Sequence, residues 1–349
     1  MKASYTQTHP SAVPDTAVMT ASVDSFEPQT MEEALSQTTV EHLQLAKGRF
    51  LGQMMHARFT TSMLDWGSYN LPLLATAGMP TDEVTLGFIL ASDGESLMNG
   101  KSFTAPTFAL FTEGTELNYR LAANTQWMAL QVERDLLEPV GLSLQQGFAG
   151  PLAEPSRDNL QLRRDLQDAL AVLRNISSRR PDPGIPDPAG CMKQLEACFL
   201  DLMTSAFASG QPGPAPGTRH RSETIRLVRE ATDFIMSHMA EPVRIGSLCC
   251  EMGCDLKSLE RAFHSVHGMA PRQFLTVSRI NKARQLLLQS NGRNDVTNIA
   301  SACGIHHLGR FSQAYHSWFG ERPSETLSRS RLSCKATRPE PKRIRHPRS

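Results

Sequence analysis

The sequence predicts an α+β protein in which a β-rich N-terminal half precedes an all-α C-terminal half. Short runs of β-favouring residues, separated by turn residues, occur between residues 31 and 137. A helix-turn-helix pattern occurs twice between Val243 and Thr326. A stretch rich in Gly and Pro, residues 209–217, lies between the halves and has the composition of a linker.

The first half has the texture of a small antiparallel barrel or sandwich. The segments with strand composition are residues 58–64, 85–90, 107–112 and 117–121. The tight-turn signals are Asp93-Gly94, Asn99-Gly100 and Glu113-Gly114. Two later segments, within residues 160–173 and 192–203, space their apolar residues as amphipathic helices do.

The first helix-turn-helix pattern begins near Ile245. Gly253 provides the turn, because a left-handed residue lets two short helices meet steeply, and Asp255 caps the second helix. The expected inward residues are Ile245, Leu248 and Met252, followed by Leu259, Ala262, Phe263 and Val266. The residues left outside on the second helix are Leu256, Lys257, Ser258, Glu260, Arg261 and His264.

The second pattern repeats this plan, with Gly304 at the turn. The expected inward residues are Val296, Ile299, Ala300 and Cys303, followed by Phe311, Ala314, Tyr315 and Trp318. The outward residues are Leu308, Gly309, Arg310, Gln313 and His316. An outward-facing second helix of this kind fits the major groove of DNA, and we call it a recognition helix.

A long amphipathic segment joins the two patterns and predicts a helix over residues 272–289, ended by Asn291-Gly292. Its length sets the separation of the recognition helices. If both are to enter successive major grooves on one face, they must lie about 34 Å apart, or the DNA must bend.

The last third of the chain resembles the AraC family of bacterial transcription regulators. The residues that carry the resemblance are Ile245, Leu248, Gly253, Leu259, Arg261, Phe263, Gly268, Pro271, Phe274, Leu275, Arg279, Ile280, Ala283, Leu286, Leu287, Ile299, Ala300, Gly304, Phe311, Ser312, Phe319, Gly320, Pro323 and Ser324. Departures are Gly309, where the family often has a polar group, Gln313, where Arg is common, and Leu327-Ser328, where Tyr-Arg is common.

The resemblance implies a cupin-like N-terminal barrel that binds a small effector, followed by helices that pair two subunits. The pattern Trp66-Gly67, Asn70-Leu71-Pro72, Asn99-Gly100 and Trp127 is also similar to the sensor half of ethanolamine-utilisation regulators. We therefore expect five segments. They are a disordered segment at residues 1–30, a sensing and dimerisation domain at 31–207, a linker at 208–220, a DNA-binding domain at 221–328 and a basic tail at 329–349.

Charge is segregated in the same way. From Thr218 onward, 22 Lys and Arg stand against 11 Asp and Glu, and the preceding part holds 14 against 24. A basic module joined to an acidic one is typical of a nucleic-acid reader with a separate sensor, although solubility alone is the alternative explanation. The basic tail either attracts phosphates or is a solvated chain end.

The candidate DNA-binding residues are Leu256, Lys257, Ser258, Glu260, Arg261, His264, Leu308, Gly309, Arg310 and Gln313. Arg261 can hold guanine O6 and N7, and Lys257 can serve a base or a phosphate, whereas ordinary solvated charges are the alternative for both. Glu260 could accept from cytosine N4 or pair with a neighbouring Lys. Gly309 removes a side chain from the second reading face, so we expect that helix to contribute mainly positioning contacts.

No catalytic motif is found, and no cofactor, metal site or ligand-binding set is assigned from the sequence. The cluster Cys249, Cys250 and Cys254 matches no zinc spacing, and buried thiols are the favoured interpretation, with redox sensing as the alternative. Trp66, Asn70, Glu116 and Trp127 could line an effector pocket, or could pack and make turns.

These observations predict a transcription regulator, expected to be an activator. Its expected partners are a double-stranded DNA operator, RNA polymerase, a small-molecule effector and a second copy of the chain. The alternatives are a cupin-type enzyme fused to a DNA-binding module, for which His42 and His56 are too few metal ligands, and an architectural DNA-binding protein without an effector. Without an apolar leader or a bilayer-length apolar run, we expect a cytoplasmic protein that does not contact membranes.

Overall fold

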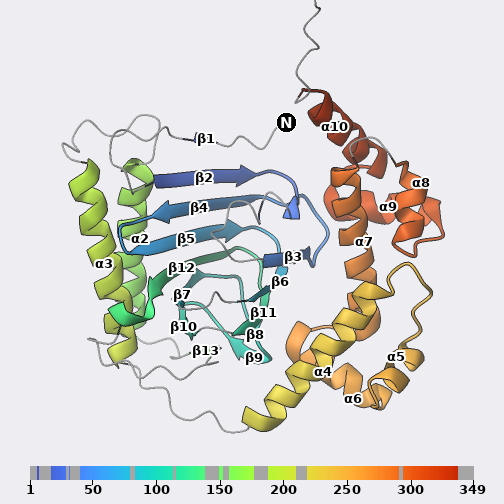
Figure 1. Ribbon diagram of the computed structural model, residues 1–349, viewed down its shortest axis with the longest axis horizontal. Helices are drawn as coiled ribbons and strands as arrows, with labels where there is room; N and C mark the ends of the chain where they lie inside the picture. Colours follow the sequence, from blue (N-terminus) through green and yellow to red (C-terminus); the bar gives the residue numbers. More distant parts are fainter. Residues whose placement is uncertain are drawn as a thin grey trace, which may run out of the picture.

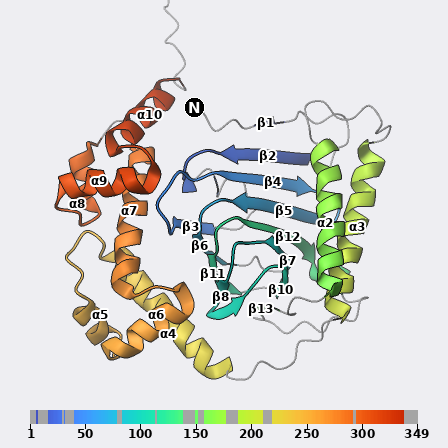
Figure 2. The same cartoon turned by 180° about the vertical axis from the view of Figure 1, so that it is seen from behind.

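The computed structural model describes residues 6–7, 17–28, 31, 40–78, 83–112, 115–137, 149–151, 157–176, 188–209, 218–290 and 294–336. Within these ranges the elements form layers: a helical hairpin, two β-sheets and a C-terminal group of helices (Figures 1 and 2). The β-rich first half and the helical second half confirm the predicted α+β class.

The larger sheet is antiparallel and has eight strands. They are β1 (Thr6–Gln7), β2 (Ala17–Val23), β4 (Gly52–Arg58), β5 (Ser62–Tyr69), β7 (Glu83–Ala91), β10 (Thr107–Phe111), β12 (Thr125–Glu133) and β13 (Ala149–Pro151). Their order is β1-β2-β4-β5-β12-β7-β10-β13. The segment expected as one strand at residues 58–64 is instead the turn between β4 and β5 with the strand residues on each side of it.

The smaller sheet has five strands, in the order β3-β6-β11-β8-β9. They are β3 (Val40–Gln44), β6 (Leu73–Gly78), β8 (Ser96–Met98), β9 (Lys101–Phe103) and β11 (Glu116–Leu121). Asn99 and Gly100, predicted as a tight turn, join β8 to β9 with φ of 46° and 72°, the left-handed conformation that a two-residue hairpin loop needs.

A helical hairpin covers the outer face of the larger sheet. It consists of α2 (Arg157–Ile176) and α3 (Pro188–Ser209), and a short 3-10 helix, η1 (Arg134–Leu136), follows β12. Leu166, Leu170 and Leu173 are buried against this face as the sequence predicts. The buried Glu196 of α3 accepts hydrogen bonds from the Thr61 amide at 2.7 Å and the Ser62 hydroxyl at 3.0 Å, which ties the hairpin to the β4–β5 turn.

The C-terminal helices contain the two predicted helix-turn-helix units. They are α4 (Thr218–Ser237), α5 (Ile245–Glu251), α6 (Leu256–His267), α7 (Pro271–Gln289), α8 (Val296–Ala302), α9 (Leu308–Phe319) and α10 (Pro323–Ala336). Gly253 and Gly304 have φ of +61° and +66°, so both predicted turns are confirmed. The predicted joining helix is α7. Ala314, expected to face inward, is exposed on α9.

The smaller sheet packs against the C-terminal helices, and the two halves share a core. Asn281 of α7 accepts a hydrogen bond from the Gln44 amide at 3.0 Å and donates to the Gln44 carbonyl at 3.1 Å. The Phe26 ring stacks on Phe319 with 6.3 Å between centroids. We call this contact between β3 and α7 the seam. It holds the two halves against each other, whereas a Gly/Pro-rich linker is typical of halves that move independently.

The expected disorder of residues 1–30 is wrong for residues 17–28. Ala17–Val23 form β2 and pair with β4 along seven residues. Val23 and Phe26 are buried in the shared core. The average composition of this segment is polar, but its few apolar residues are placed where they can be buried, and this burial offsets the ordering entropy.

The domain boundaries of the second half also shift. α3 reaches Ser209 and α4 begins at Thr218, so of the expected linker only residues 210–217 lie outside the described ranges. The basic tail expected from residue 329 begins inside α10, where Arg329 donates to Glu321 at 2.5 and 2.9 Å and pairs with Glu27 at 3.8 Å. Residues 337–349 of that tail lie outside the described part.

Candidate nucleic-acid interface and internal cavity

The first recognition helix, α6, begins at Asp255, whose carboxylate accepts from the Ser258 amide at 2.9 Å and the Ser258 hydroxyl at 2.7 Å. These hydrogen bonds lower the pKa of Asp255. Ser258 is therefore occupied in the cap and is half-buried. The other predicted contact residues of this helix are exposed: Leu256, Lys257, Glu260, Arg261 and His264.

Arg261 lies along its own helix. Its Nη2 donates to the Ser258 hydroxyl at 3.3 Å and its Nε to the Lys257 carbonyl at 3.4 Å. Both hydrogen bonds are long and solvent-exposed, so releasing them to reach a base costs little.

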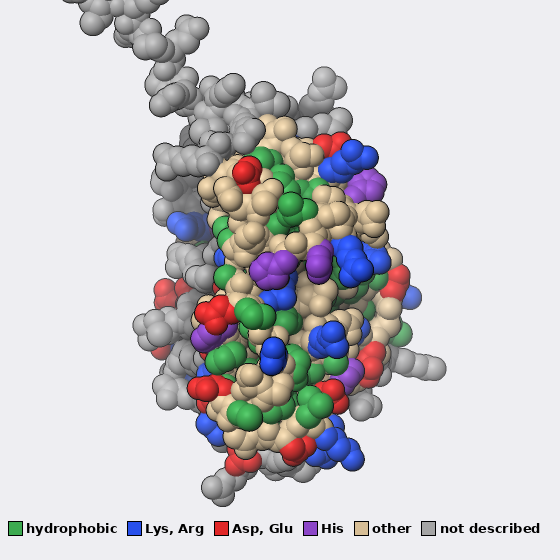
Figure 3. Space-filling view, turned by 90° about the vertical axis from the view of Figure 1, so that its right-hand side faces the viewer, with side chains coloured by type: hydrophobic (Ala, Val, Ile, Leu, Met, Phe, Trp, Pro, Cys, Tyr) green, Lys and Arg blue, Asp and Glu red, His purple; other side chains and the backbone are tan. Residues whose placement is uncertain are grey.

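The second recognition helix, α9, presents all four of its predicted contact residues to solvent: Leu308, Gly309, Arg310 and Gln313. A Cβ on Gly309 would meet no atom within 4 Å, so packing within the protein does not require Gly there. Leu256 and Leu308 begin their respective helices and are 50% and 38% exposed. Figure 3 looks onto this half of the molecule, where Lys, Arg and His side chains lie among apolar ones.

The opposite face of each recognition helix is buried. In α6 the buried residues include Leu259, Phe263 and Val266, and in α9 they include Phe311, Tyr315 and Phe319. His267, at the end of α6, stacks on Phe274 with 4.9 Å between centroids. Burial lowers the pKa of His267 to about 4. This imidazole is therefore a neutral core group near pH 7.

One buried cation was not foreseen. Arg284 of α7 is fully buried, and its Nη1 donates to Glu321 at 2.8 Å and to the Tyr315 hydroxyl at 3.1 Å, while its Nε donates to the Phe26 carbonyl. Burial alone would raise the pKa of Glu321, but hydrogen bonds from Arg329 and the charge of Arg284 hold it below its usual value. Nothing in the helical periodicity distinguishes Arg284 from a solvated Arg.

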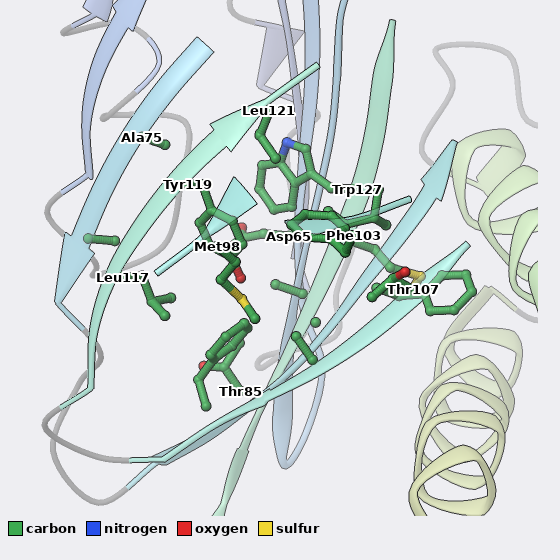
Figure 4. Close-up of a pocket in the computed structure, with 18 of the residues that line it drawn as sticks. Asp65, Ala75, Thr85, Met98, Phe103, Thr107, Leu117, Tyr119, Leu121 and Trp127 are labelled. Carbon is green, nitrogen blue, oxygen red and sulfur yellow. The ribbon is translucent and has the colours of Figure 1, made fainter. Parts of the chain in front are cut away.

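A cavity of about 130 Å³ lies between the two sheets (Figure 4). The larger sheet contributes side chains such as Thr85, Phe111 and Trp127, and the smaller one contributes Met98 and Tyr119. The wall is mostly apolar. The remaining lining side chains include Tyr69, Ala75, Ala77, Ile89, Phe103, Thr107, Ala109, Leu117, Leu121 and Gln131.

Two ionisable groups of the wall are Asp65 and His42. The Asp65 carboxyl Oδ1 lies 2.9 Å from Nδ1 of the buried His56, at hydrogen-bonding distance. Burial raises the pKa of Tyr69, and the neighbouring Trp127 indole opposes that rise. The Tyr69 and Trp127 rings have centroids 6.3 Å apart.

The cavity accounts for one of the four residues considered from the sequence. Trp127 lines it. Trp66 lies on the other face of the larger sheet, where the Arg174 guanidinium sits 3.8 Å from its ring centroid. Asn70 makes a turn, accepting from the Leu51 amide at 2.7 Å and donating to the Arg49 carbonyl at 3.0 Å. The Glu116 side chain lies outside the described part.

The cysteines of the first unit occupy unlike environments. Cys249 is buried, Cys254 half-buried and Cys250 exposed, and burial raises the pKa of Cys249. Burial also raises the pKa of Cys303, to about 11. In the described ranges, no three His, Cys, Asp or Glu side chains are grouped closely enough to hold a metal ion. In the same ranges, no helix has the length and apolar content needed to cross a bilayer.

Comparisons with known proteins agree with the helical half. A family model described as a helix-turn-helix domain matches residues 248–329. The XylDLEGF operon transcriptional activator 2 of Pseudomonas putida is 32% identical over 143 residues, which are 41% of this chain and 82% of that protein. The probable thc operon regulatory protein of Rhodococcus erythropolis is 34% identical over 102 residues, but the match spans only 29% of this chain and 31% of the relative.

Among solved structures, a probable AraC family transcriptional regulator from Rhodopseudomonas palustris is 34% identical. The match covers 30% of this chain and 98% of that one, with a TM-score of 0.28. The residues that the helix-turn-helix family model matches span both helix-turn-helix units, from within α5 onward. Because the match to the Pseudomonas putida activator covers most of that relative, the chain belongs to the AraC family of DNA-binding transcription regulators.

Proposed function

We propose that the protein reads an operator with α6 and α9 under the control of a small molecule held between its two sheets. The position of β11 carries this proposal. Its Leu117, Tyr119 and Leu121 line the cavity, whereas Arg120, which lies between Tyr119 and Leu121 in the strand, faces the end of α6. One strand thus borders both the ligand space and a recognition helix.

The contact between β11 and α6 is close. A Cβ on Gly268, the residue that ends α6 with φ of +67°, would lie 2.7 Å from Arg120 Cδ. At the neighbouring hairpin, a Cβ on Gly100 would lie 3.4 Å from the Ser265 carbonyl of α6. Closely packed residues leave no free space to absorb a displacement. A shift of β11 towards α6 would therefore move α6 as well.

Control of this kind requires differential affinity. A ligand changes the arrangement of α6 and the smaller sheet only if it binds one arrangement more tightly than the other. Moving the equilibrium from 1:99 to 99:1 takes a difference of about 5.5 kcal/mol. A modest effector response therefore needs only part of the affinity that a mostly apolar cavity can provide.

The exposed faces of α6 and α9 supply the groups that would read bases. Arg261 suits the two acceptors of guanine, and Gln313 suits the donor and acceptor of adenine, at about 1–3 kcal/mol of discrimination each. Lys257 and Arg310 are suited to phosphates as well as bases. The exposed side chains of Leu256 and Leu308 suit thymine methyl groups.

The length of α7 sets the spacing of these contacts. Its 19 residues span about 28 Å at 1.5 Å per residue. Successive major grooves on one face lie about 34 Å apart. The two units therefore approach adjacent grooves, and a modest bend of the DNA brings both recognition helices into register.

The remaining partners follow from the relatives. The Pseudomonas putida relative is a transcriptional activator by name, and we propose activation through contact with RNA polymerase for this chain. We also propose that two copies pair through α2 and α3 and act in the cytoplasm. Sedimentation of the full chain at micromolar concentration should show a dimer; a monomer at all concentrations would contradict the pairing.

The first test is genome-wide DNA occupancy of the tagged full chain. Discrete peaks upstream of a few operons are expected and would supply the operator sequence. Diffuse occupancy would instead favour an architectural role without an effector.

The second test is the substitution Arg261→Ala, measured by fluorescence anisotropy on operator and random DNA. Loss of a base contact should weaken operator binding by about 1–3 kcal/mol and leave random DNA nearly unchanged. Arg58→Ala, which removes an exposed cation from the end of β4, is the matched control and should change neither. Equal weakening on both DNAs would show that Arg261 contacts only phosphate.

A further inference from the structure

We infer that the cavity between the sheets takes a neutral, single-ring aromatic compound that carries a hydroxyl or carbonyl group, such as a phenol. This inference names the ligand class for the effector control proposed above and rests on that proposal for its regulatory meaning. Size, wall chemistry, buried polar groups and charge support it separately.

Size limits the ligand to about one ring. The cavity measures about 130 Å³. An apolar protein cavity of about 150 Å³ admits benzene, so this one has room for a ring with a small substituent. Two fused rings would require the wall to move, and packed strands resist such movement.

The wall favours an aromatic ligand. Phe111, Tyr119 and Trp127 contribute rings from three different strands. Met98 contributes a thioether, and Figure 4 shows it together with Tyr119 and Trp127. The Phe111 and Tyr119 rings are 6.0 Å apart and nearly perpendicular. Aromatic rings pack edge-to-face or offset on such surfaces, and methionine sulfur adds a favourable contact with a ring edge.

Buried polar atoms at the wall call for a ligand with a hydrogen-bonding group. Thr85 is 4% exposed and Tyr69 is 2% exposed, and both line the cavity. Within the described residues, the Thr85 hydroxyl has no hydrogen-bond partner, and the Tyr69 hydroxyl has only the neighbouring Trp127 indole, in poor geometry. A buried donor without a partner is costly, so a ligand hydroxyl or carbonyl that pairs with one of them gains affinity.

The charge of the wall disfavours an anion. Among its described residues, the wall contains no Lys and no Arg, and it contains Asp65. A carboxylate ligand would lose its hydration without gaining a fixed Lys or Arg cation, and it would lie beside the Asp65 carboxyl, which is already hydrogen-bonded to His56. A neutral aromatic ligand avoids both costs.

Calorimetry on the full chain without DNA tests the ligand class with phenol, benzoate, toluene and 2-naphthol as probes. Phenol should bind most tightly. Benzoate, of similar shape but charged, should bind at least about 100-fold more weakly. Toluene, which lacks the polar group, should bind about fivefold more weakly, and 2-naphthol should bind weakly because of its size.

The nearly isosteric substitution Thr85→Val tests the polar contact. It should weaken phenol binding about fivefold and leave toluene binding equal or stronger, because the unpaired hydroxyl is gone. Thr276→Val, on the exposed side of α7, is the matched control and should change neither affinity. If Thr85→Val leaves the phenol-to-toluene preference unchanged, the polar contact is wrong.

Operator affinity with and without each probe separates this inference from the proposed function. If phenol binds but operator affinity does not change, the proposal that a ligand controls DNA binding is wrong, and the inferred ligand class still holds. Benzoate binding more tightly than phenol, with a change in operator affinity, would keep the effector control and overturn the ligand class. Failure of every probe to bind would also overturn the ligand class.

Discussion

His267 shows how a single buried residue sets the acid sensitivity of the DNA-binding half. It lies at the end of α6 between the Phe263 and Phe274 rings, with its Nε2 3.4 Å from the Thr232 hydroxyl of α4. Burial lowers its pKa to about 4 from the usual value of about 6.5. The neutral form is therefore favoured in the folded state, and the unfolded chain binds a proton first as the pH falls.

We predict that the stability from this group is complete above pH 6.5 and is lost as the pH falls towards 4. The loss is on the order of 3 kcal/mol. Urea unfolding followed by circular dichroism between pH 4 and 7.5 should show that His267→Leu has a flatter pH dependence than the wild type. The same substitution at the exposed His264 is the control. Parallel curves for wild type and His267→Leu would contradict the prediction.

Arg284 is the second residue whose environment determines its role. Its guanidinium is buried at the point where Phe26, Glu321 and Tyr315 meet. Its Nη1 and Nε donate to these groups, and the ring of Phe319 lies 4.5 Å from the guanidinium carbon. Arg284 thus connects the segment after β2 to α9 and to the α9–α10 loop through hydrogen bonds that an apolar residue cannot make.

We expect Arg284→Met to lower the free energy of unfolding by about 2–4 kcal/mol. Glu321 would lose one partner and keep Arg329, which limits the cost of the buried carboxylate. The measurement is chemical denaturation of the full chain, with Arg226→Met as the control, since Arg226 is an exposed member of a helical i,i+4 pair. A change below 1 kcal/mol for Arg284→Met would contradict the buried role.

At the scale of elements, the two helix-turn-helix turns use the same conformation in different surroundings. Gly253 and Gly304 both have left-handed φ values, and a side chain there costs about 1 kcal/mol. A Cβ on Gly253 would meet no atom within 4 Å. A Cβ on Gly304 would lie 2.4 Å from the Met239 carbonyl, which also accepts from Arg279 at 3.2 Å.

Gly253 serves as the control for Gly304, because both have a left-handed φ but only Gly304 lies against another backbone group. Gly253→Ala should destabilise the protein by about 1 kcal/mol, because only the backbone conformation is strained. Gly304→Ala should cost more, about 2–4 kcal/mol, since the Met239 carbonyl must also move. Thermal unfolding of both variants compares the two costs. Equal losses of stability would contradict this, because they would mean that the Met239 carbonyl in the α4–α5 loop can move aside without a cost in free energy.

At the scale of the whole molecule, the smaller sheet separates the cavity from the DNA-binding helices. His42 and Ala75 face the cavity, whereas their neighbours Leu43 and Leu74 pack towards α6 and α7. This alternation is the normal consequence of strand geometry. A ligand in the cavity is therefore separated from the DNA-binding helices by a single layer, the smaller sheet.

We predict that loosening this seam increases the mobility of both halves. Asn281→Ala removes the two hydrogen bonds between α7 and Gln44. The Gln44 carbonyl keeps the Trp318 indole as a donor at 3.2 Å, but the buried Gln44 amide loses its Asn281 partner, at a cost of about 1–3 kcal/mol. Hydrogen exchange measured by mass spectrometry should increase in both β3 and α7. The exposed Asn298→Ala is the control. Faster exchange in α7 alone would show that the seam does not couple the halves.

The sequence by itself determined the features that depend on residues a few positions apart. The two glycine turns, the Asp255 cap, α7 and the exposed faces of the recognition helices follow from helical periodicity and local backbone sterics. Only the tertiary structure decided the features that join distant residues. Asn281 meets Gln44 across 237 positions, and Arg284 meets Phe26 across 258. The cavity wall is made of side chains from nine strands, and no local sequence pattern indicates which of these strands lie next to one another. Those contacts depend on which faces pack together, and that choice is made by the burial of the whole core.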